Sequence, residues 1–165
     1  MEQRVLSMLV DNTSGVLSRV AGLFSRRGYN IDSLTVGETA DPRYSRMTVV
    51  VNGDDQILDQ ITKQLAKLID VVDIKALKHG ESVNRELIMV KVRAEAKDRQ
   101  GISAITDIFR AKVVDVTRDS MIIELTGDQP KLNAFLELMG DYEILELART
   151  GITGLSRGAD DVRYL

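Results

Sequence analysis

The apolar positions of this chain form short runs and helical stripes that repeat one order of elements twice. Short apolar runs bounded by polar turn residues predict strands, and apolar residues spaced three or four apart predict helices. In residues 4–77 the order is strand, helix, strand, strand, helix, strand. The strands are expected at Arg4–Val10, Ile31–Glu38, Met47–Asn52 and Val71–Leu77, and the helices at Gly15–Arg27 and 54–69.

The same order returns in the second half of the chain. Strands are expected at Glu86–Arg93, Lys112–Thr117, Met121–Thr126 and Glu143–Ala148, and helices at Gly101–Arg110 and Gln129–Met139. A βαββαβ order of this length is typical of a ferredoxin-like unit. The predicted fold class is therefore α+β, with two consecutive ferredoxin-like βαββαβ units.

The polar stretches between these elements set the predicted domain boundaries. Residues 1–77 form the first domain and residues 85–150 the second, joined by a polar linker at residues 78–84. Residues 151–165 contain three glycines and follow the last expected strand. We therefore expect residues 151–165 to be a mobile C-terminal tail.

Composition is ordinary for a globular protein, with 44% hydrophobic and 28% charged residues in 165. Aromatic residues are only 4% and Trp is absent, so Val, Ile, Leu and Met must build the cores. Cores of such small units are thin, and burial of a further face against a partner would help both units. The absence of Cys excludes disulfides and thiolate chemistry and favours a reducing, cytoplasmic location.

Charge and hydropathy exclude two further classes of partner. Residues 1–77 carry nine basic against ten acidic side chains, and residues 78–165 carry thirteen against fifteen. Neither half is a basic module, so nucleic acid is not expected as the main partner. Glu2 and Arg4 are charged residues at positions where a signal peptide would have its apolar run. No apolar run approaches the length of a membrane span. We expect neither export by that route nor membrane insertion.

Catalytic and metal-binding constellations are missing from the sequence. His79, the single histidine, lies in the expected linker, and without a second His or a Cys it fits no familiar triad or zinc site. The acidic pairs Asp54-Asp55 and Asp160-Asp161 are adjacent in sequence, so their side chains diverge. No glycine-rich phosphate loop follows a strand. The chain is expected to be no enzyme by itself and to hold no metal or cofactor.

The best candidate site combines the stretch Asp11–Leu17 with Asn30-Ile31. An Asn amide offers both a donor and an acceptor, and the first turn of a helix offers unpaired N–H groups. Together they could hold a zwitterionic amino acid. The alternative is purely structural, with Asn12 or Ser14 capping the helix and Asn30 occupying a turn position of positive φ. In this topology the two segments need not meet within one subunit, but they can meet across a symmetric pair.

At this point the residues resemble a known family. Residues 11–36, DNTSGVLSRVAGLFSRRGYNIDSLTV, are similar to the N-terminal ACT domain of the small regulatory subunits of acetolactate synthase, also called acetohydroxyacid synthase. The similarity extends over Ser45–Thr48, Lys63–Val71, Ile108–Arg110, Asp115–Thr117 and Arg149–Gly158.

The resemblance implies a regulatory role in valine, leucine and isoleucine biosynthesis. In this family a separate large subunit holds thiamine diphosphate, Mg²⁺ and FAD and performs the carboligation of pyruvate. The small subunit raises that activity and confers feedback inhibition by valine. Family members form a homodimer through their ACT domains, and the effector binds at the dimer interface.

The resemblance also assigns effector-binding residues. Asn12 and Gly15 of the first loop and Asn30 of the other protomer would contact the effector, which is valine, with leucine or isoleucine able to compete. Val16, Leu17 and Ile31 would supply further donors or a wall. The alternative is an ACT-type amino-acid sensor that regulates another enzyme or a transcription system.

Overall fold

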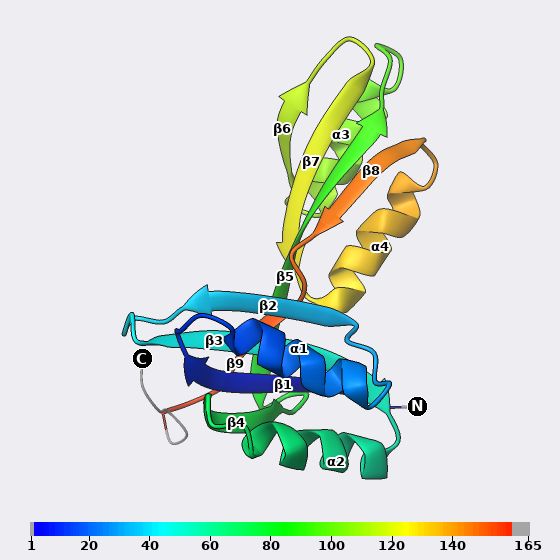
Figure 1. Ribbon diagram of the computed structural model, residues 1–165. Helices are drawn as coiled ribbons and strands as arrows, with labels where there is room; N and C mark the ends of the chain where they lie inside the picture. Colours follow the sequence, from blue (N-terminus) through cyan, green and yellow to red (C-terminus); the bar gives the residue numbers. More distant parts are fainter. Residues whose placement is uncertain (1, 160–165) are drawn as a thin grey trace. The chain divides into compact units, whose positions relative to one another are not determined.

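A computed structural model describes residues 2–159 and divides them into two compact units. Residues 2–83 and 152–159 form the first unit, and Asn84–Gly151 form the second (Figure 1). Both units contain the predicted βαββαβ order, so the α+β fold class is confirmed.

The first unit is a four-stranded antiparallel sheet covered on one face by two helices. The strand order is β2-β3-β1-β4. The strands are β1 (Glu2–Asp11), β2 (Ser33–Glu38), β3 (Tyr44–Gly53) and β4 (Val71–Leu77), and the helices are α1 (Val16–Arg26) and α2 (Asp55–Ala66). Asp54 caps α2 as its type and position predict, since its Oδ1 accepts from the Ile57 N–H at 2.9 Å.

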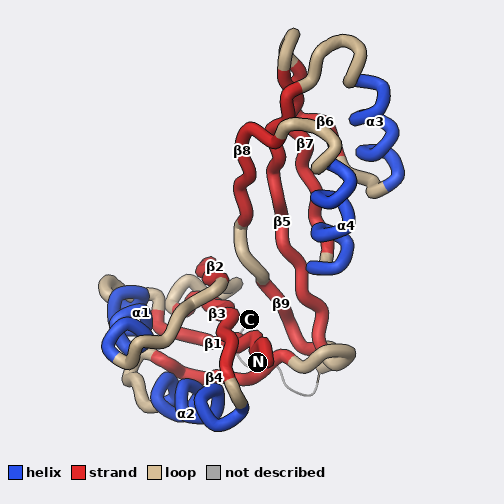
Figure 2. Tube along the Cα trace, turned by 90° about the vertical axis from the view of Figure 1, so that its right-hand side faces the viewer, coloured by secondary structure: helices blue, strands red, loops and turns tan. Residues whose placement is uncertain are grey.

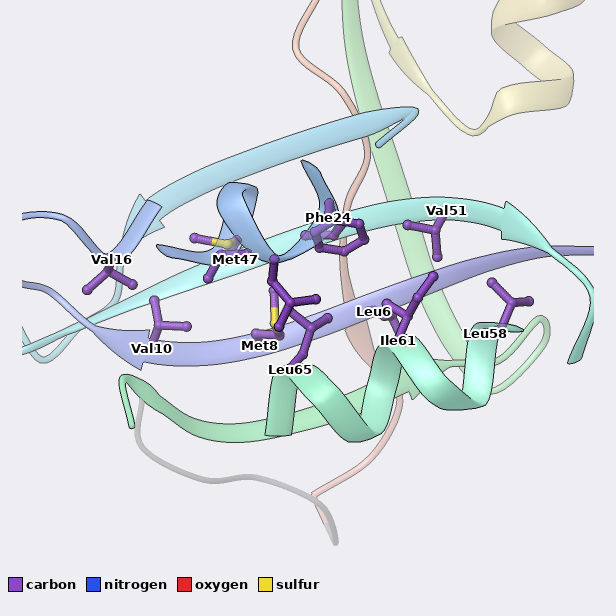
Figure 3. Close-up of a cluster of buried hydrophobic side chains, with 13 residues drawn as sticks. Leu6, Met8, Val10, Val16, Phe24, Met47, Val51, Leu58, Ile61 and Leu65 are labelled. Atoms are coloured by element: carbon purple, nitrogen blue, oxygen red, sulfur yellow. The ribbon is translucent and has the colours of Figure 1, made fainter. Parts of the chain in front are cut away.

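The main core of this unit lies between the sheet and the two helices (Figure 3). Alternate residues of the central strands point into it, because successive side chains of a strand face opposite sides. The helices contribute residues spaced three or four apart, whereas Ile69, which the apolar stripe of the second helix also included, lies beyond α2 and is exposed. The cluster contains Leu6, Met8, Val10, Val16, Val20, Leu23, Phe24, Met47, Val49, Val51, Leu58, Ile61 and Leu65.

Strand register fixes where the ends of β1 and β2 lie. Both strands pair antiparallel with β3, so they run in the same direction. Asp11 lies opposite Tyr44 and Glu38 lies opposite Ser45, which places the ends of β1 and β2 at one edge of the sheet. Ser33 pairs with Val50, so β2 begins toward the opposite edge.

The second unit repeats the architecture. Its strand order, β6-β7-β5-β8, matches that of the first unit, and α3 and α4 cover one face (Figure 2). The elements are β5 (Ser82–Arg93), α3 (Arg99–Ile108), β6 (Lys112–Val116), β7 (Ser120–Gly127), α4 (Gln129–Met139) and β8 (Ile144–Arg149). Ile88, Val90, Ile102, Ile123 and Phe135 are fully buried at its centre.

The prediction of a mobile tail is wrong for the part of residues 151–165 that the structure describes. Thr153–Ser156 form β9, which pairs with β5. Ile152 is 5% exposed and packs with Val5, Val50 and Leu77. These three residues lie on the sheet face that the helices leave open. Covering them with Ile152 removes apolar surface from water, which is favourable. The rest of the expected tail, residues 160–165, lies outside the described residues.

The expected linker at residues 78–84 is shorter than predicted. A turn in which the Glu81 N–H donates to the Lys78 carbonyl follows β4, and β5 begins at Ser82. Residues 82–84 therefore belong to a strand. Among the helices of residues 2–159, none is long and apolar enough to cross a membrane.

Candidate functional site

The turn between β1 and α1 leaves the first N–H groups of the helix uncapped by a side chain. Gly15 is the N-cap residue, with φ +85°, and within the described chain no side chain caps α1. The first bond of the helix runs from the Arg19 N–H to the Gly15 carbonyl at 3.0 Å. The purely structural alternative, in which Asn12 or Ser14 caps the helix, is therefore wrong. The N–H groups of Val16 to Ser18 precede the helical hydrogen bonds and can serve an anion.

Asn12 is tied to the loop that joins β2 and β3. Its backbone N–H donates to the Arg43 carbonyl at 2.8 Å. Its side-chain Nδ2 donates to the Pro42 carbonyl at 2.9 Å and more weakly to Glu38 Oε2 at 3.4 Å. Because the amide nitrogen is used in this way, the Oδ1 atom is what Asn12 offers to a ligand, and Oδ1 can only accept.

Asn30 is held in a similar way at the other end of β2. Its Nδ2 donates to Asp32 Oδ1 at 2.8 Å, and Asn52 donates to the second oxygen of the same carboxylate. Asn30 therefore keeps its Oδ1 as an acceptor and the second N–H of its amide as a donor. In the described chain only Arg110 combines a side chain with a positive φ, so the left-handed turn role considered for Asn30 is wrong.

The remaining candidate residues differ in burial. The Val16 side chain is 4% exposed and belongs to the core, so only its backbone can face a ligand. Leu17 is 47% exposed, and Ile31 is half-buried against the same core. Leu17 and Ile31 can therefore contribute apolar wall.

The structure does not bring Asn12 and Asn30 together within one chain. Asn12 lies level with the end of β2, whereas Asn30 precedes its start. The six residues of β2 span roughly 20 Å at the usual rise per strand residue. One protomer therefore supplies the two halves of the candidate site at separate places.

An ion pair between Arg19 and Asp70 lies beside the turn. Arg19, one turn into α1, donates to both carboxylate oxygens of Asp70, from Nε at 2.6 Å and from Nη2 at 2.9 Å. The Asp70 carbonyl also accepts from the Asp11 N–H at 2.9 Å. The two residues are 51 positions apart, and no local pattern links them.

The electrostatics of this pair follow from its geometry. The Asp70 side chain is 9% exposed and that of Arg19 is 49% exposed. Hydrogen bonding to Arg19 lowers the pKa of Asp70, although burial of the carboxyl acts in the opposite direction. The same bond raises the pKa of Arg19. The pair therefore stays ionised and ties α1 to the residue before β4.

Side chains suited to metal binding are dispersed. Across residues 2–159 no three His, Asp or Glu side chains gather as a metal site. His79 is exposed in the turn after β4. The concentration of polar groups around the β1–α1 turn suits recognition of a small ligand by hydrogen bonds.

Comparison with known families covers both units. Residues 6–73 match a family described as "AHAS small subunit-like ACT domain". Residues 85–158 match a family described as "Small subunit of acetolactate synthase". The matches include the β1–α1 turn, Asn30 and the segment that forms β9.

Individual relatives are similar over nearly the whole chain. A protein of Methanothermobacter thermautotrophicus named "Probable acetolactate synthase small subunit" is 51% identical over 96% of this chain and 95% of its own length. The "Acetolactate synthase isozyme 3 small subunit" of Escherichia coli is 49% identical over 94% and 96%. The crystal structure of the acetolactate synthase small subunit from Thermotoga maritima is 42% identical, with a TM-score of 0.88 over 96% of this chain and 99% of that one.

Proposed function

Because the chain belongs to the family of small subunits of acetolactate synthase, we propose that it activates the catalytic large subunit and confers feedback inhibition by valine. Family membership and the ACT domain give it a regulatory role in that enzyme. The proposal extends to a non-catalytic, cytoplasmic subunit of branched-chain amino acid biosynthesis. Thiamine diphosphate, Mg²⁺ and FAD would belong to the large subunit. The family matches favour this role over that of a sensor for another enzyme or for transcription.

The position of β2 supports a site shared between two copies of the chain. β2 is an edge strand, so its outer side has no strand partner within the sheet. If two copies pair their β2 strands antiparallel about a two-fold axis, the start of one lies beside the end of the other. Asn30 of one protomer then approaches the edge at which Asn12 of the other is bound to Glu38 and Pro42. The observation that carries the proposal is the open edge of β2, with Asn30 before its start and Asn12 level with its end.

The polar groups on the two sides suit the two ends of an amino acid. The uncapped N–H groups after Gly15 would bind the carboxylate, because they are donors at the positive end of a helix dipole. The Oδ1 atoms of Asn12 and Asn30 would accept from the ammonium, because the Asn12 Nδ2 donates to Pro42 and Glu38 and the Asn30 Nδ2 donates one of its two N–H groups to Asp32. The Asn12 Nδ2 is bound to the Pro42 carbonyl, so we assign the carboxylate to the backbone N–H groups alone.

The apolar wall sets the expected selectivity. Leu17 and Ile31 would contact the isopropyl group of valine. One methylene in an apolar pocket is worth only about 1 kcal/mol, so leucine and isoleucine should compete with valine.

Binding at an interface provides a means of regulation. Valine would stabilise one packing of the ACT pair, and the catalytic subunit would respond to that packing. By linkage, the catalytic state that valine favours must in turn raise valine affinity by the same factor.

A mixing experiment tests the shared site. Asn12→Ala and Asn30→Ala are prepared separately, and each homodimer is expected to lose high-affinity valine binding in calorimetry. After exchange of subunits, a mixed dimer contains one site with both asparagines and one with neither. The mixture should therefore regain valine binding at wild-type affinity, with a stoichiometry of one site per mixed dimer.

The controls separate the possible failures. Asn133→Ala, on an exposed part of α4 in the second unit, should leave valine binding unchanged. Mixing that restores no binding, although mass spectrometry demonstrates mixed dimers, would contradict a site shared between protomers. Wild-type protein that neither binds valine nor activates a large subunit would contradict the function itself.

A further inference from the structure

We infer that Arg19 is an additional effector-binding residue, which presents its Nη1 to the carboxylate of the bound amino acid while Asp70 orients the guanidinium. This inference rests on the proposed function and adds to it a side chain that recognises the charge of the ligand. Arg19 lies outside the set of residues that the family resemblance assigns.

The geometry of the ion pair leaves one edge of the guanidinium available. An arginine carries five N–H donors in one plane. Asp70 engages Nε and Nη2, and neither of its two bonds uses Nη1. Nη1 is therefore the terminal nitrogen that can donate to a second acceptor.

Nη1 lies over the turn that would receive the carboxylate. A Cβ placed on Gly15 would lie 2.9 Å from Nη1, closer than real Cβ contacts come. The same position is 3.7 Å from Cζ and 3.9 Å from Nη2, so Nη1 is the nearest part of the guanidinium. Gly15 immediately precedes the uncapped N–H groups of α1. The guanidinium thus lies beside the residue at which these N–H groups begin.

The burial of the two partners distinguishes their roles. Asp70 is 9% exposed, whereas Arg19 is 49% exposed. The carboxylate is therefore the fixed part of the pair, and the guanidinium faces the solvent from which a ligand arrives. A guanidinium already held by two hydrogen bonds loses little further freedom on binding a carboxylate, so recognition is preorganised.

A purely structural role for the pair makes a different prediction. If Arg19 only ties α1 to the residue before β4, its replacement should weaken every ligand of the turn by the same factor. If Arg19 contacts the carboxylate, replacement should weaken only ligands that carry one. Valine and valinamide differ at this group, because valinamide has a neutral amide in its place.

The test measures the ratio of the valinamide and valine dissociation constants for the full-length protein by calorimetry, with valinamide measured by displacement of valine. Wild-type protein should prefer valine. Arg19→Gln should lower this preference by about tenfold or more, the usual effect of losing a hydrogen bond to a charged group. Asp70→Asn should lower the preference less, because the guanidinium remains but loses its orientation. Arg26→Gln, in the last turn of the same helix, is the matched control and should leave the preference unchanged.

The outcomes separate this inference from the proposed function. Equal weakening of valine and valinamide in Arg19→Gln would overturn the inference and leave the pair a structural tie. Should Arg19→Gln fail to fold, Arg19→Lys keeps the positive charge without the planar fork, and its preference should fall between those of wild type and a neutral substitution. An unchanged preference in Arg19→Lys would also overturn the inference. Failure of the wild-type protein to bind valine would instead contradict the proposed function.

Discussion

The backbone N–H of Ile152 donates a hydrogen bond to the Ser33 hydroxyl at 2.8 Å, although 119 positions separate the two residues. The Ile152 carbonyl accepts from the Thr35 hydroxyl at 3.2 Å, so residue 152 is bound on both its polar groups by β2. The chain thus leaves the second unit at Gly151 and is at once anchored on the edge strand of the first. β2, the strand through which we propose that two copies pair, is therefore held by Ile152, the residue just before β9.

Ile152→Ala should destabilise the first unit. The side chain is 5% exposed among Val5, Val50 and Leu77, and truncation of a buried Ile typically costs about 2–4 kcal/mol. Hydrogen exchange of the β1 and β3 amides measures the loss of stability in the first unit separately from the second. Leu155→Ala, at a residue 63% exposed in β9, is the control and should change stability by less than about 0.5 kcal/mol. Equal protection in both variants would mean that residue 152 does not stabilise the sheet.

Gly15→Ala should impair effector binding as well as stability. The residue has φ +85°, and a side chain in this region costs about 1–2 kcal/mol. The new Cβ would also displace the Arg19 guanidinium. Gly28→Ala is a close control, because Gly28 has φ +68° and nothing lies within 4 Å of its Cβ position. Both variants should unfold at lower urea concentration, but only Gly15→Ala should bind valine more weakly in calorimetry.

Stability of the first unit should fall in acid through Asp70. The pKa of Asp70 is lowered in the folded protein from an ordinary 3.8, so its ionised carboxylate adds to the free energy of unfolding above pH 3.8. This stabilisation is lost as the pH falls from 3.8 through the lower pKa of the folded state. Asp70→Asn should therefore be less stable than wild type near neutrality, and the difference should shrink below pH 3.8. Urea midpoints between pH 2 and pH 7 measure this. A difference that stays constant over the range would show that ionisation of Asp70 does not contribute.

Val36→Glu should disrupt the proposed dimer. Val36 is 47% exposed on the edge strand β2, where a pair of copies would bring two such residues close together. Two carboxylates there would repel, as charged residues on edge strands generally oppose pairing. Analytical ultracentrifugation should detect monomers, and valine binding should weaken with the loss of the pair. Val72→Glu, at an exposed residue of the other edge strand β4, is the control and should remain dimeric.

Asn12→Ala should separate inhibition from activation. Removal of the Asn12 Oδ1 takes away one of the two proposed acceptors of the ammonium, which costs about 1–3 kcal/mol of valine binding. Activation of the large subunit should persist, because Asn12 is exposed in a turn outside the core. Titration of the reconstituted enzyme with valine measures both quantities. Loss of activation together with inhibition would indicate that the turn also contacts the large subunit.

The sequence by itself determined the two folds, the helix that Asp54 caps, and the residues of the β1–α1 turn. These features depend on local periodicity and on residues close together in the chain, which a sequence displays directly. Residues 11–36 were also sufficient to indicate the family, and the comparisons confirmed the family membership.

Only the tertiary structure decided how the turn is supported and how residues 152–156 are held. The Arg19–Asp70 pair joins residues 51 positions apart, and the Ile152–Ser33 bond joins residues 119 apart. In the sequence, residues 151–156 resemble a tail, because the segment is rich in glycine and its few apolar residues show no periodicity. Their order comes from burying Ile152 on a sheet face formed by β1, β3 and β4. Contacts between distant segments form where folding brings complementary surfaces together, and no local pattern in either segment records them.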